Sequence, residues 1–332
     1  MSPTDSRVAV LGAGAWGTAL AIQLARNGVH VKLWGHREKL LATMATERVN
    51  RRYLPGIHFP EALIPDSRLE NTLYKTDFIL IAVPSTGFTE VISRLPEGTA
   101  PVFWATKGLD CETGKPLHER AREILGETRG IGVVSGPSFA IEVARRLPTA
   151  ITVAANSATL ARRFACLLHS ERFRTYTSTD LTGVELGGAA KNVIAIAAGI
   201  ADGLGFGANA RAGIITRGLA EIRRLGRVLG ARPATLMGLA GLGDLVLTCT
   251  DDQSRNRRFG LELGGGATVE SAHKRIAGAV EGIPAAAALT RLAREKNIEM
   301  PISEAVQAVL SGHQAPRDAV ATLMRRSMKP ER

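Results

Sequence analysis

One lysine residue stands in a setting where an amino group could take part in proton transfer. Lys191 lies among small and apolar residues in the stretch GGAAKNV (187–193). A lysine that is buried in such surroundings loses hydration, which lowers its pKa and suits it to proton transfer near neutral pH. The alternative for Lys191 is that its stem covers apolar surface while its ammonium group reaches solvent. The local pattern leaves both interpretations open.

A second set of polar residues suits the recognition of an anion. The segment Ser254-Arg255-Asn256 combines a residue that commonly caps a helix with a guanidinium group. The free N–H groups of a capped helix start and the fork of an arginine both bind phosphate. A surface cap without a ligand is the alternative. Asp244 follows the glycine-rich stretch GLG (241–243) and precedes an apolar run, so it could simply be a helix N-cap.

The segment GAGAWG (12–17) has the spacing G-x-G-x-x-G. It follows an apolar strand pattern (7–11) and opens a helical pattern (16–26), after which a second strand pattern begins (29–34). In this context the glycines allow a tight turn, a close approach of the backbone to a pyrophosphate, and close packing of helix on strand. The positive end of the helix then faces the pyrophosphate. The sequence therefore predicts a dinucleotide site, with a glycine-rich turn that binds nothing as the alternative.

The residues after the second strand bear on the choice of dinucleotide. The order there is Trp34-Gly35-His36-Arg37-Glu38. An acidic group at this point would bond the ribose 2′-hydroxyl, whereas a cation would favour a 2′-phosphate. His36 and Arg37 come first, and Glu38 is expected to begin the next helix. We therefore favour NADPH over NADH, and an exposed His-Arg pair without a ligand is the alternative.

The first half of the chain alternates strand and helix patterns that could position these residues. Apolar segments of strand length occupy 77–83, 101–105 and 131–135, and 149–154 and 172–176 plausibly extend the same sheet. Apolar strands separated by helices predict an α/β fold, here a Rossmann-type doubly wound parallel sheet. The segments TKG (106–108) and GPSFA (136–140) follow two of these strands, at the carboxyl edge where ligands bind in open sheets.

The second half of the chain has a different sequence pattern. After about Asp180 the patterns are helical, at 181–203, 209–229, 284–296, 301–310 and 317–324. A length of 332 residues also favours two domains over one core. We expect an NAD(P)-binding Rossmann domain at 1–182 and an all-α C-terminal domain at 183–332 that binds substrate and carries the catalytic groups.

Composition narrows the class of partner. The formal net charge is +11, but the basic residues are scattered and aromatic residues make up only 5% of the chain. This pattern argues against nucleic acid and fits a small anionic, phosphorylated substrate. The cysteines, Cys111, Cys166 and Cys249, have neither metal-site nor disulfide spacing, so we expect no metal and a cytoplasmic location. The long apolar stretch 183–207 contains charged residues, so we expect no membrane span.

Taken together, these segments resemble the bacterial NAD(P)-dependent glycerol-3-phosphate dehydrogenases. Ala15 and Ala190 stand where related sequences often have other residues, and neither change threatens the chemistry. The similarity runs from residue 8 to about 285 through ordered motifs: GAGAWGTALA (12–21), YLPG (53–56), VPS (83–85), KGL (107–109), GPSFA (136–140), GVELGGAAKN (183–192), ITRGLAE (215–221), GLGDLVLTC (241–249), SRN (254–256) and VEG (280–282).

The resemblance implies a homodimer that reversibly reduces dihydroxyacetone phosphate to sn-glycerol 3-phosphate for glycerophospholipid synthesis. It implies that Lys191 exchanges a proton with the C2 oxygen and that Lys107 and Asp244 assist catalysis. The substrate-binding residues would be Lys107, Gly136, Ser138, Lys191, Asp244, Ser254, Arg255 and Asn256. The residues around NADPH or NADH would be Gly12, Gly14, Ala15, Trp16, Gly17, His36, Arg37, Lys107, Ala140, Arg255, Ala279 and Glu281.

Two other functions remain open at this point. A related reductase with a Rossmann head and a helical tail could act on a hydroxy acid or a sugar acid, for which the segment Ser254-Arg255-Asn256 would not be required. A regulator that senses NADPH without catalysis would keep the glycine loop but would need no proton donor.

Overall fold

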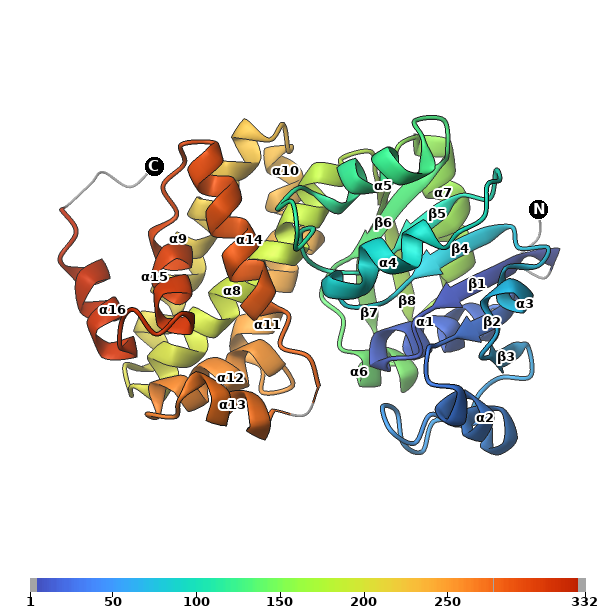
Figure 1. Cartoon of the computed structure of the whole chain (residues 1–332), viewed down its shortest axis with the longest axis horizontal. Coiled ribbons are helices and arrows are strands. Elements are labelled where there is room, and N and C mark those ends of the chain that lie inside the picture. The colour runs from blue at the N-terminus through green and yellow to red at the C-terminus, as the bar shows by residue number, and fades with distance from the viewer. Residues whose placement is uncertain (1–4, 277, 328–332) are drawn as a thin grey trace. The chain divides into compact units, whose positions relative to one another are not determined.

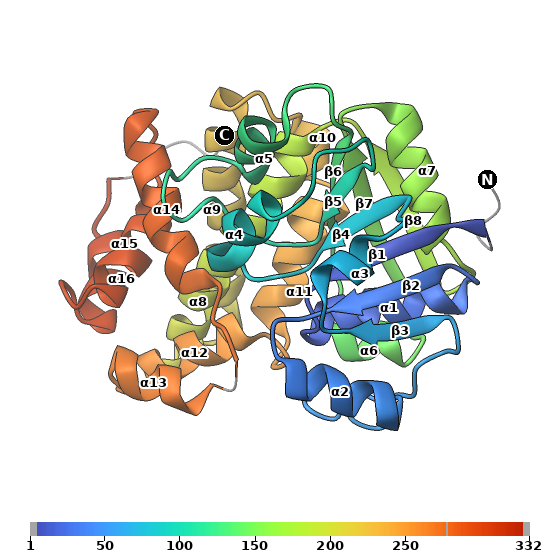
Figure 2. The same cartoon turned by 45° about the vertical axis from the view of Figure 1, so that its right-hand side comes forward.

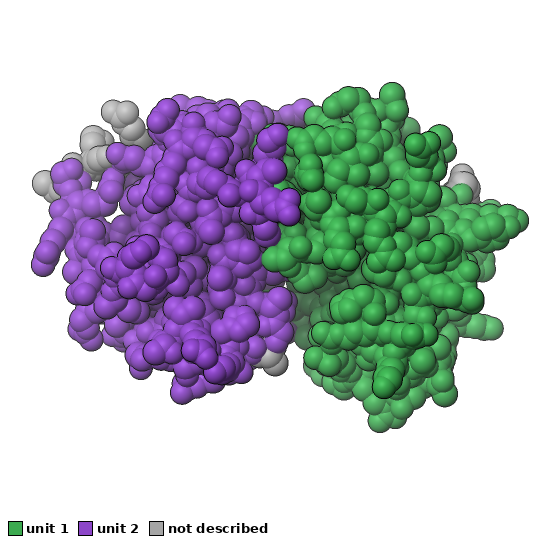
Figure 3. Space-filling view, in the orientation of Figure 1, with its two compact units in different colours: residues 1–110, 116–185 green, residues 111–115, 186–332 purple. Residues whose placement is uncertain are grey.

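The computed structural model describes residues 5–276 and 278–327. The chain forms two compact units, which Figure 3 shows in different colours. Unit 1 comprises Met1–Asp110 and Pro116–Glu185, and unit 2 comprises Cys111–Lys115 and Leu186–Arg332.

Unit 1 is built on an eight-stranded sheet with the order β3-β2-β1-β4-β5-β6-β7-β8 (Figure 1). All neighbouring strands are parallel except β6 and β7. The prediction of a Rossmann-type α/β sheet is therefore confirmed. The strands are β1 (Arg7–Leu11), β2 (His30–Trp34), β3 (Leu63–Asp66), β4 (Phe78–Ile81), β5 (Val102–Trp104), β6 (Ile131–Ser135), β7 (Thr149–Ala155) and β8 (Phe173–Ser178).

One pair of neighbouring strands departs from the parallel order, because β7 runs antiparallel to β6. The connection between these strands contains only the helix α6 (Ala140–Ala144). β7 enters the sheet from the opposite end and pairs with β6 in the opposite direction.

Helices cover both faces of this sheet (Figures 1 and 2). On one face α1 packs with α6 and α7, and on the other α4 packs with α5. The short strand β5 shows why both faces are apolar: Phe103 stacks on Phe164 of α7, whereas Trp104 meets Phe88 of α4 edge-on. The helices and the short 3-10 turn of unit 1 are α1 (Ala15–Arg26), α2 (Glu38–Glu47), α3 (Leu69–Leu73), η2 (Ser85–Gly87), α4 (Phe88–Ser93), α5 (Leu117–Leu125), α6 and α7 (Ala158–Leu168).

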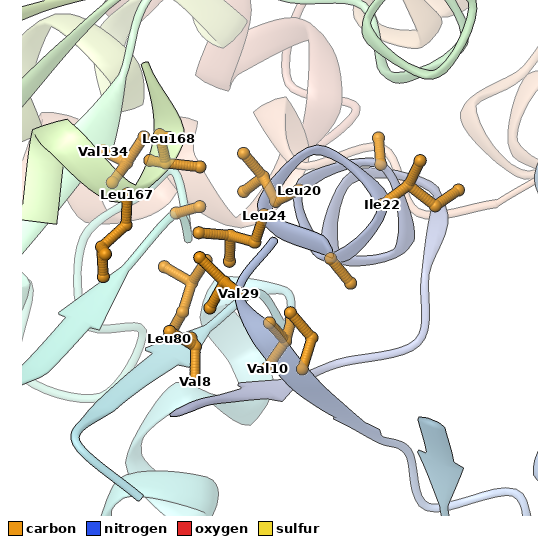
Figure 4. Close-up of a cluster of buried hydrophobic side chains, with 14 of the residues drawn as sticks. Val8, Val10, Leu20, Ile22, Leu24, Val29, Leu80, Val134, Leu167 and Leu168 are labelled. Carbon is orange, nitrogen blue, oxygen red and sulfur yellow. The ribbon is translucent and has the colours of Figure 1, made fainter. Parts of the chain in front are cut away.

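The main core of unit 1 lies between α1 and the central strands. Val8, Val10 and Leu80 from the strands gather with Leu20 and Leu24 of α1, and each of these side chains is at most 1% exposed (Figure 4). Burying one such aliphatic side chain contributes about 1.5–3 kcal/mol. This packing fixes the start of α1, and with it the glycine loop that precedes the helix.

The boundary between the units falls inside α8 (Leu181–Gly203), and the described elements that follow are all helical. The expected helical second half is thus confirmed, although the elements at 233–250 and 269–275 were not predicted. The further elements of unit 2 are α9 (Gly207–Val228), α10 (Pro233–Leu236), the π-helical turn η3 (Leu239–Gly243), α11 (Asp244–Thr250), α12 (Arg255–Gly264), α13 (Val269–Arg275), α14 (Gly282–Glu295), α15 (Pro301–Leu310) and α16 (Pro316–Met324).

Two segments, α8 and Pro233–Thr250, are long and apolar enough to cross a membrane by composition alone. The apolar window of α8 is entirely buried within the protein, so α8 is a core helix. Pro233–Thr250 is divided among α10, η3 and α11. Neither segment needs a membrane to account for its composition.

Glycines bring α8 and α12 into backbone contact. A Cβ atom added to Gly199 would lie 2.0 Å from the carbonyl oxygen of Arg257, and one added to Gly260 would lie 2.1 Å from that of Ile196. Both distances are far too short for a real side chain. The two helices can therefore cross closely only because these positions are glycine.

A buried carboxylate joins α9 to α15. Glu221 is 2% exposed and accepts hydrogen bonds from the backbone N–H groups of Ile302 (2.7 Å) and Ser303 (3.3 Å), as well as from the Ser303 hydroxyl (3.1 Å). It thereby satisfies N–H groups in the first turn of α15. Burial raises the pKa of Glu221 to about 7, although these hydrogen bonds oppose the shift.

Candidate functional site

The glycine loop between β1 and α1 has space for a ligand at one glycine and is filled by protein at the other two. A Cβ on Gly12, whose φ is +130°, would lie 2.4 Å from the carbonyl oxygen of Ala82, and one on Gly17 would lie 1.9 Å from that of Gly12. A Cβ on Gly14 would meet nothing within 4 Å. Gly12 and Gly17 thus serve the turn and the helix packing, and Gly14 leaves the backbone open to a pyrophosphate.

The loop also presents hydrogen-bond donors. Gly14 is the N-cap of α1, so it offers no side-chain acceptor to the first N–H groups of this helix. The indole Nε1 of Trp16 is buried and has no hydrogen-bond partner within the described residues. A buried donor of this kind is costly unless a ligand or water satisfies it. These features fit the dinucleotide that the sequence predicts here.

Asn50 supports the loop, and sequence reasoning missed it. Its side chain is fully buried, and its amide donates to the carbonyl oxygen of Ala13 (3.1 Å) and to the hydroxyl of Thr18 (2.9 Å). It therefore links the turn to the first helical residues. The only signal was its position three residues before the motif YLPG (53–56).

His36 and Arg37 follow β2 and are exposed, and Arg37 is the N-cap of α2, which begins at Glu38 as predicted. A Cβ on Gly35 would lie 3.0 Å from the Cβ of Ala13, so the end of β2 lies against the glycine loop. Basic side chains, not a carboxylate, therefore come first at the point where folds of this type read a ribose 2′ substituent.

Three of the expected substrate residues lie together in unit 1. The Nζ atom of Lys107 donates to the carbonyl oxygen of Gly136 (3.2 Å), and the Ser138 hydroxyl donates to the same oxygen (2.9 Å). Gly136 has a φ of +143°, and a Cβ there would be 3.0 Å from the Cα of Ile151. Ala140, assigned to the cofactor, begins α6 four residues later. The carboxyl ends of β5 and β6 thus bring Lys107 and Ser138 together.

A buried polar cluster in unit 1 was not predicted. The Glu185 carboxylate, 4% exposed, accepts from the indole Nε1 of Trp104 (2.9 Å) and lies 2.5 Å from Nδ1 of His118. Burial lowers the pKa of His118, but the charge and the hydrogen bond of Glu185 outweigh that effect, so the pKa is raised overall. The charge of Glu185 within the otherwise apolar start of α8 was the feature of the sequence that could have indicated this cluster.

Lys191 lies in α8 and is buried, with 6% of its surface exposed. Its Nζ atom is 2.5 Å from Oδ1 of Asp244 and donates to the hydroxyl of Thr248 at 2.8 Å. The alternative in which this ammonium group reaches solvent is therefore wrong. Thr248 was not predicted, although it stands one helical turn after Asp244.

Asp244 is not a helix cap, so that alternative was also wrong. The N-cap of α11 is Gly243, and Asp244 is the first residue of the helix with only 1% of its surface exposed. The π-helical turn η3 directly precedes it. The Asp244 carboxylate points instead to Lys191, which compensates its buried charge.

The start of α12 has the predicted form. Ser254 is the N-cap, and its hydroxyl accepts from the backbone N–H of Arg257 at 3.2 Å. Arg255 is exposed, and a Cβ on Gly278 would lie 2.9 Å from its guanidinium group, so Arg255 lies beside the segment that contains Ala279. The capped end therefore presents N–H groups together with an arginine fork.

Asn256 ties this end of α12 to α8 and α14. Its amide donates to Oδ1 of Asn192 (2.8 Å), and its oxygen accepts from the backbone N–H of Gly282 (2.9 Å). The Asn192 amide in turn lies 3.5 Å from the Glu281 carboxylate. Because Asn192 follows Lys191 directly, unit 2 brings the expected substrate residues of α8, α11 and α12 into one connected network.

Among the described residues, no group of three or more His, Cys, Asp or Glu side chains is placed to hold a metal ion. The three cysteines are free thiols, and burial raises the pKa of Cys249 to about 12. That thiol is therefore protonated at neutral pH.

Comparison with known proteins decides the family. The model of the NAD-dependent glycerol-3-phosphate dehydrogenase N-terminus matches residues 7–161, and that of the C-terminus matches residues 180–321. The chain belongs to the NAD-dependent glycerol-3-phosphate dehydrogenase family. The resemblance seen in the motifs is thereby confirmed.

Individual members of the family match over their full length. Glycerol-3-phosphate dehydrogenase (NAD(P)+) of Halorhodospira halophila is 55% identical over 98% of both chains. The enzyme of the same name from Cronobacter sakazakii is 51% identical over 100% of this chain and 99% of its own. The crystal structure of glycerol-3-phosphate dehydrogenase from Coxiella burnetii has a TM-score of 0.93 at 47% identity and covers 97% of this chain and 99% of its own.

Reductases outside the family share only the fold. D-mandelate dehydrogenase aligns with a TM-score of 0.63 at 13% identity, and a probable 2-dehydropantoate 2-reductase from Bacillus subtilis with 0.58 at 16%. The alternative of a reductase for hydroxy or sugar acids is therefore not favoured.

Proposed function

We propose that this chain reduces dihydroxyacetone phosphate to sn-glycerol 3-phosphate, reversibly and with NADPH or NADH, and so supplies glycerophospholipid synthesis. Membership of the family makes it an NAD(P)-dependent oxidoreductase with a small-molecule substrate. The observation that carries the proposal is the buried Lys191, held by Asp244 and Thr248 and adjacent in sequence to Asn192, which contacts the capped start of α12.

Lys191 is the proposed proton donor. When bound, the reduced nicotinamide supplies a hydride to the carbonyl carbon of the substrate. Negative charge then builds on the C2 oxygen, and the Nζ atom of Lys191 stabilises this charge and delivers a proton to it. Asp244 and Thr248 hold Nζ in place, and the Asp244 carboxylate offsets the cost of burying an ammonium group. In the reverse direction the same amine accepts the proton.

The start of α12 is the proposed clamp for the substrate phosphate. Ser254 caps this helix through its hydroxyl, which leaves other first-turn N–H groups to face an anion. Arg255 adds two parallel N–H donors. Asn256 orients the clamp through Asn192. The proposal extends to Lys107, Gly136 and Ser138 of unit 1, which lie together, with Lys107 as a second group that stabilises charge.

The glycine loop is the proposed binding site of the dinucleotide pyrophosphate. His36 and Arg37, which follow β2, favour a cofactor with a ribose 2′-phosphate. We therefore expect a preference for NADPH. The residues proposed to contact the cofactor are Gly12, Gly14, Ala15, Trp16, Gly17, His36, Arg37, Lys107, Ala140, Arg255, Ala279 and Glu281.

Three further points complete the proposal. Residues 1–182 form the cofactor-binding domain and residues 183–332 the substrate-binding and catalytic domain. The enzyme acts as a homodimer. It is cytoplasmic, in keeping with its free thiols and its buried α8.

Substrate discrimination tests the function. The catalytic efficiency kcat/KM is measured with dihydroxyacetone phosphate, dihydroxyacetone and simple keto acids. Two or three charge-assisted hydrogen bonds to the phosphate should favour the phosphorylated ketone by roughly a thousandfold. Arg255→Ala should lower this ratio, whereas Arg258→Ala, a change of an exposed arginine on the same helix, should not. Equal rates with and without the phosphate would reject the assignment, and no turnover at all would favour the NADPH-sensing regulator.

A further inference from the structure

A small hollow in unit 1 is lined by three arginines that the proposed reaction does not use. Arg26 is the last residue of α1, Arg146 follows α6, and Arg172 precedes β8. The hollow has a volume of about 30 Å³. The glycine loop lies at the other end of α1, and a helix of 12 residues spans roughly 18 Å. The hollow is therefore separate from the proposed pyrophosphate binding site.

The charges of these arginines are not compensated by ion pairs. Within the part of the chain that the structure describes, no carboxylate pairs with any of the three guanidinium groups. Arg26 donates to the carbonyl oxygen of Ala144 at 2.8 Å, which holds its guanidinium group at the hollow. Burial lowers the pKa of Arg26, and the like charge of Arg146 lowers it further. Arg26 is therefore a partly desolvated cation that the exposed Arg146 repels.

The backbone of Arg146 supports a specific role for its side chain. Its φ is +61°, in the left-handed region that glycine normally occupies just beyond the end of a helix. A residue with a Cβ atom is less stable in this conformation than glycine. The sequence nevertheless has an arginine there, and it lines the hollow.

Hydrogen bonds order two polar side chains that line the hollow. Gln23, 5% exposed, donates to the carbonyl oxygen of Leu168 (2.9 Å) and to the hydroxyl of Ser170 (3.1 Å). Asn27 donates to the carbonyl oxygens of Leu167 (2.8 Å) and His169 (3.0 Å). These contacts fix the end of α1 against the segment that leads to Arg172.

We propose that this hollow binds a phosphate group, either inorganic phosphate or the terminal phosphate of a monoester. Guanidinium forks match phosphate oxygens in pairs, and three of them around one anion would remove the mutual repulsion of Arg26 and Arg146. A volume of about 30 Å³, two to three times the roughly 10–15 Å³ that one water molecule needs by the same measure, admits a charged end group and not a whole nucleotide. The residues of this site do not overlap those proposed for the substrate or the cofactor.

Equilibrium dialysis with radiolabelled inorganic phosphate tests the site. The variant Arg146→Ala/Arg172→Ala removes two arginines of the hollow. The control Arg145→Ala/Arg174→Ala removes the same net charge from adjacent exposed residues that do not line it. We expect the first variant to lose one class of bound phosphate, with affinity reduced roughly tenfold or more, and the control to behave like the wild type.

Two results would overturn the site. Equal phosphate binding by the wild type and the Arg146→Ala/Arg172→Ala variant would show that the hollow binds no phosphate. An equal loss in both variants would show only a diffuse effect of net charge. Both variants should retain kcat/KM for dihydroxyacetone phosphate within about twofold, because these surface charges lie outside the proposed catalytic machinery. The comparison of phosphate binding stands whether or not the proposed reaction is correct.

A second arm separates the two sources of a phosphate monoester. Vesicles of phosphatidylcholine are compared with vesicles that also contain phosphatidic acid, using the wild type and the same two variants. Binding of soluble phosphate that vesicles do not compete with supports a free metabolite as the ligand. Binding of phosphatidic acid vesicles that is lost only in the hollow variant supports a lipid headgroup, with Leu147, 46% exposed, beside it. Binding of neither probe rejects the proposal.

Discussion

Replacing Lys191 by methionine tests the buried ion pair and the proposed proton donor together. Methionine keeps most of the apolar stem and removes the ammonium group. At 2.5 Å between Nζ and Oδ1 of Asp244, the attraction amounts to about 7 kcal/mol at an effective dielectric constant of about 20. Each ion also lost hydration worth several kcal/mol on folding, so the pair itself stabilises the fold far less. Removing only the lysine charge is costly, because it leaves the Asp244 carboxylate, which is only 1% exposed, without its partner.

Lys191→Met should therefore lower the free energy of unfolding by about 3–5 kcal/mol and kcat by roughly a hundredfold to ten-thousandfold. Binding of NADPH should change little, because the amine serves the transition state. In the double variant Lys191→Met/Asp244→Asn no charge is buried at this place. We expect its stability to recover in large part while its turnover stays low.

Urea unfolding followed by circular dichroism gives the stabilities, and NADPH oxidation in the presence of dihydroxyacetone phosphate gives the rates. The matched control is Lys274→Met, since Lys274 forms an exposed ion pair with Glu270 and should contribute less than about 1 kcal/mol. Wild-type turnover in Lys191→Met would remove this lysine from the mechanism. Turnover that returned together with stability in the double variant would show that the single change acts only through misfolding.

Four further changes probe other parts of the molecule. Gly14→Ala should leave stability unchanged but weaken the binding of NADPH, measured by fluorescence titration. Gly17→Ala should instead destabilise the fold, because its Cβ would lie 1.9 Å from a carbonyl oxygen. Similar effects of both changes would contradict the roles assigned to these two glycines. Arg37→Ala should weaken NADPH by roughly tenfold or more and leave NADH unaffected, and an unchanged preference would mean that the 2′-phosphate is read elsewhere. Glu221→Gln tests the pH dependence of stability. Burial raises the pKa of the Glu221 carboxyl from 4.5 to about 7, so the folded state binds this proton more tightly than the unfolded state does. The wild type therefore has extra stability below pH 4.5, which it loses as the pH rises through 7. The difference in unfolding free energy between wild type and variant should change by about 3 kcal/mol over that range, and parallel pH profiles would contradict it.

The elements that the sequence predicted well are those whose signal is local. The predicted helix 181–203 coincides with α8, because a long apolar stretch with helical spacing can be read without knowing its neighbours. The glycine loop was equally clear, since strand, turn and helix lie within 20 residues. Ser254 as an N-cap is likewise a property of one short segment.

The features that sequence reasoning missed depend on contacts between distant segments. Whether the Lys191 amine is buried is decided by Asp244, 53 residues later in the chain. Glu185 is satisfied by Trp104, 81 residues earlier. The antiparallel pairing of β7 with β6 is likewise a contact between segments that no hydrophobic pattern reveals. The helices α10 and α11 are 4 and 7 residues long, too short for a periodic pattern to predict.

The chemistry proposed for unit 2 depends on glycines, which have no reactive side chain. Gly199 and Gly260 let α8 and α12 meet at their backbones, and this contact holds Asn256 of α12 within hydrogen-bond distance of Asn192 of α8. Asn192 is the neighbour of Lys191, so the proposed phosphate clamp and the proposed proton donor are placed by one helix crossing. An added methyl group at Gly260 would force the helices apart at a point one turn from Asn256. A change that looks purely structural would then separate the anion clamp from the amine, so it would lower turnover through the distance between them as well as destabilise the domain.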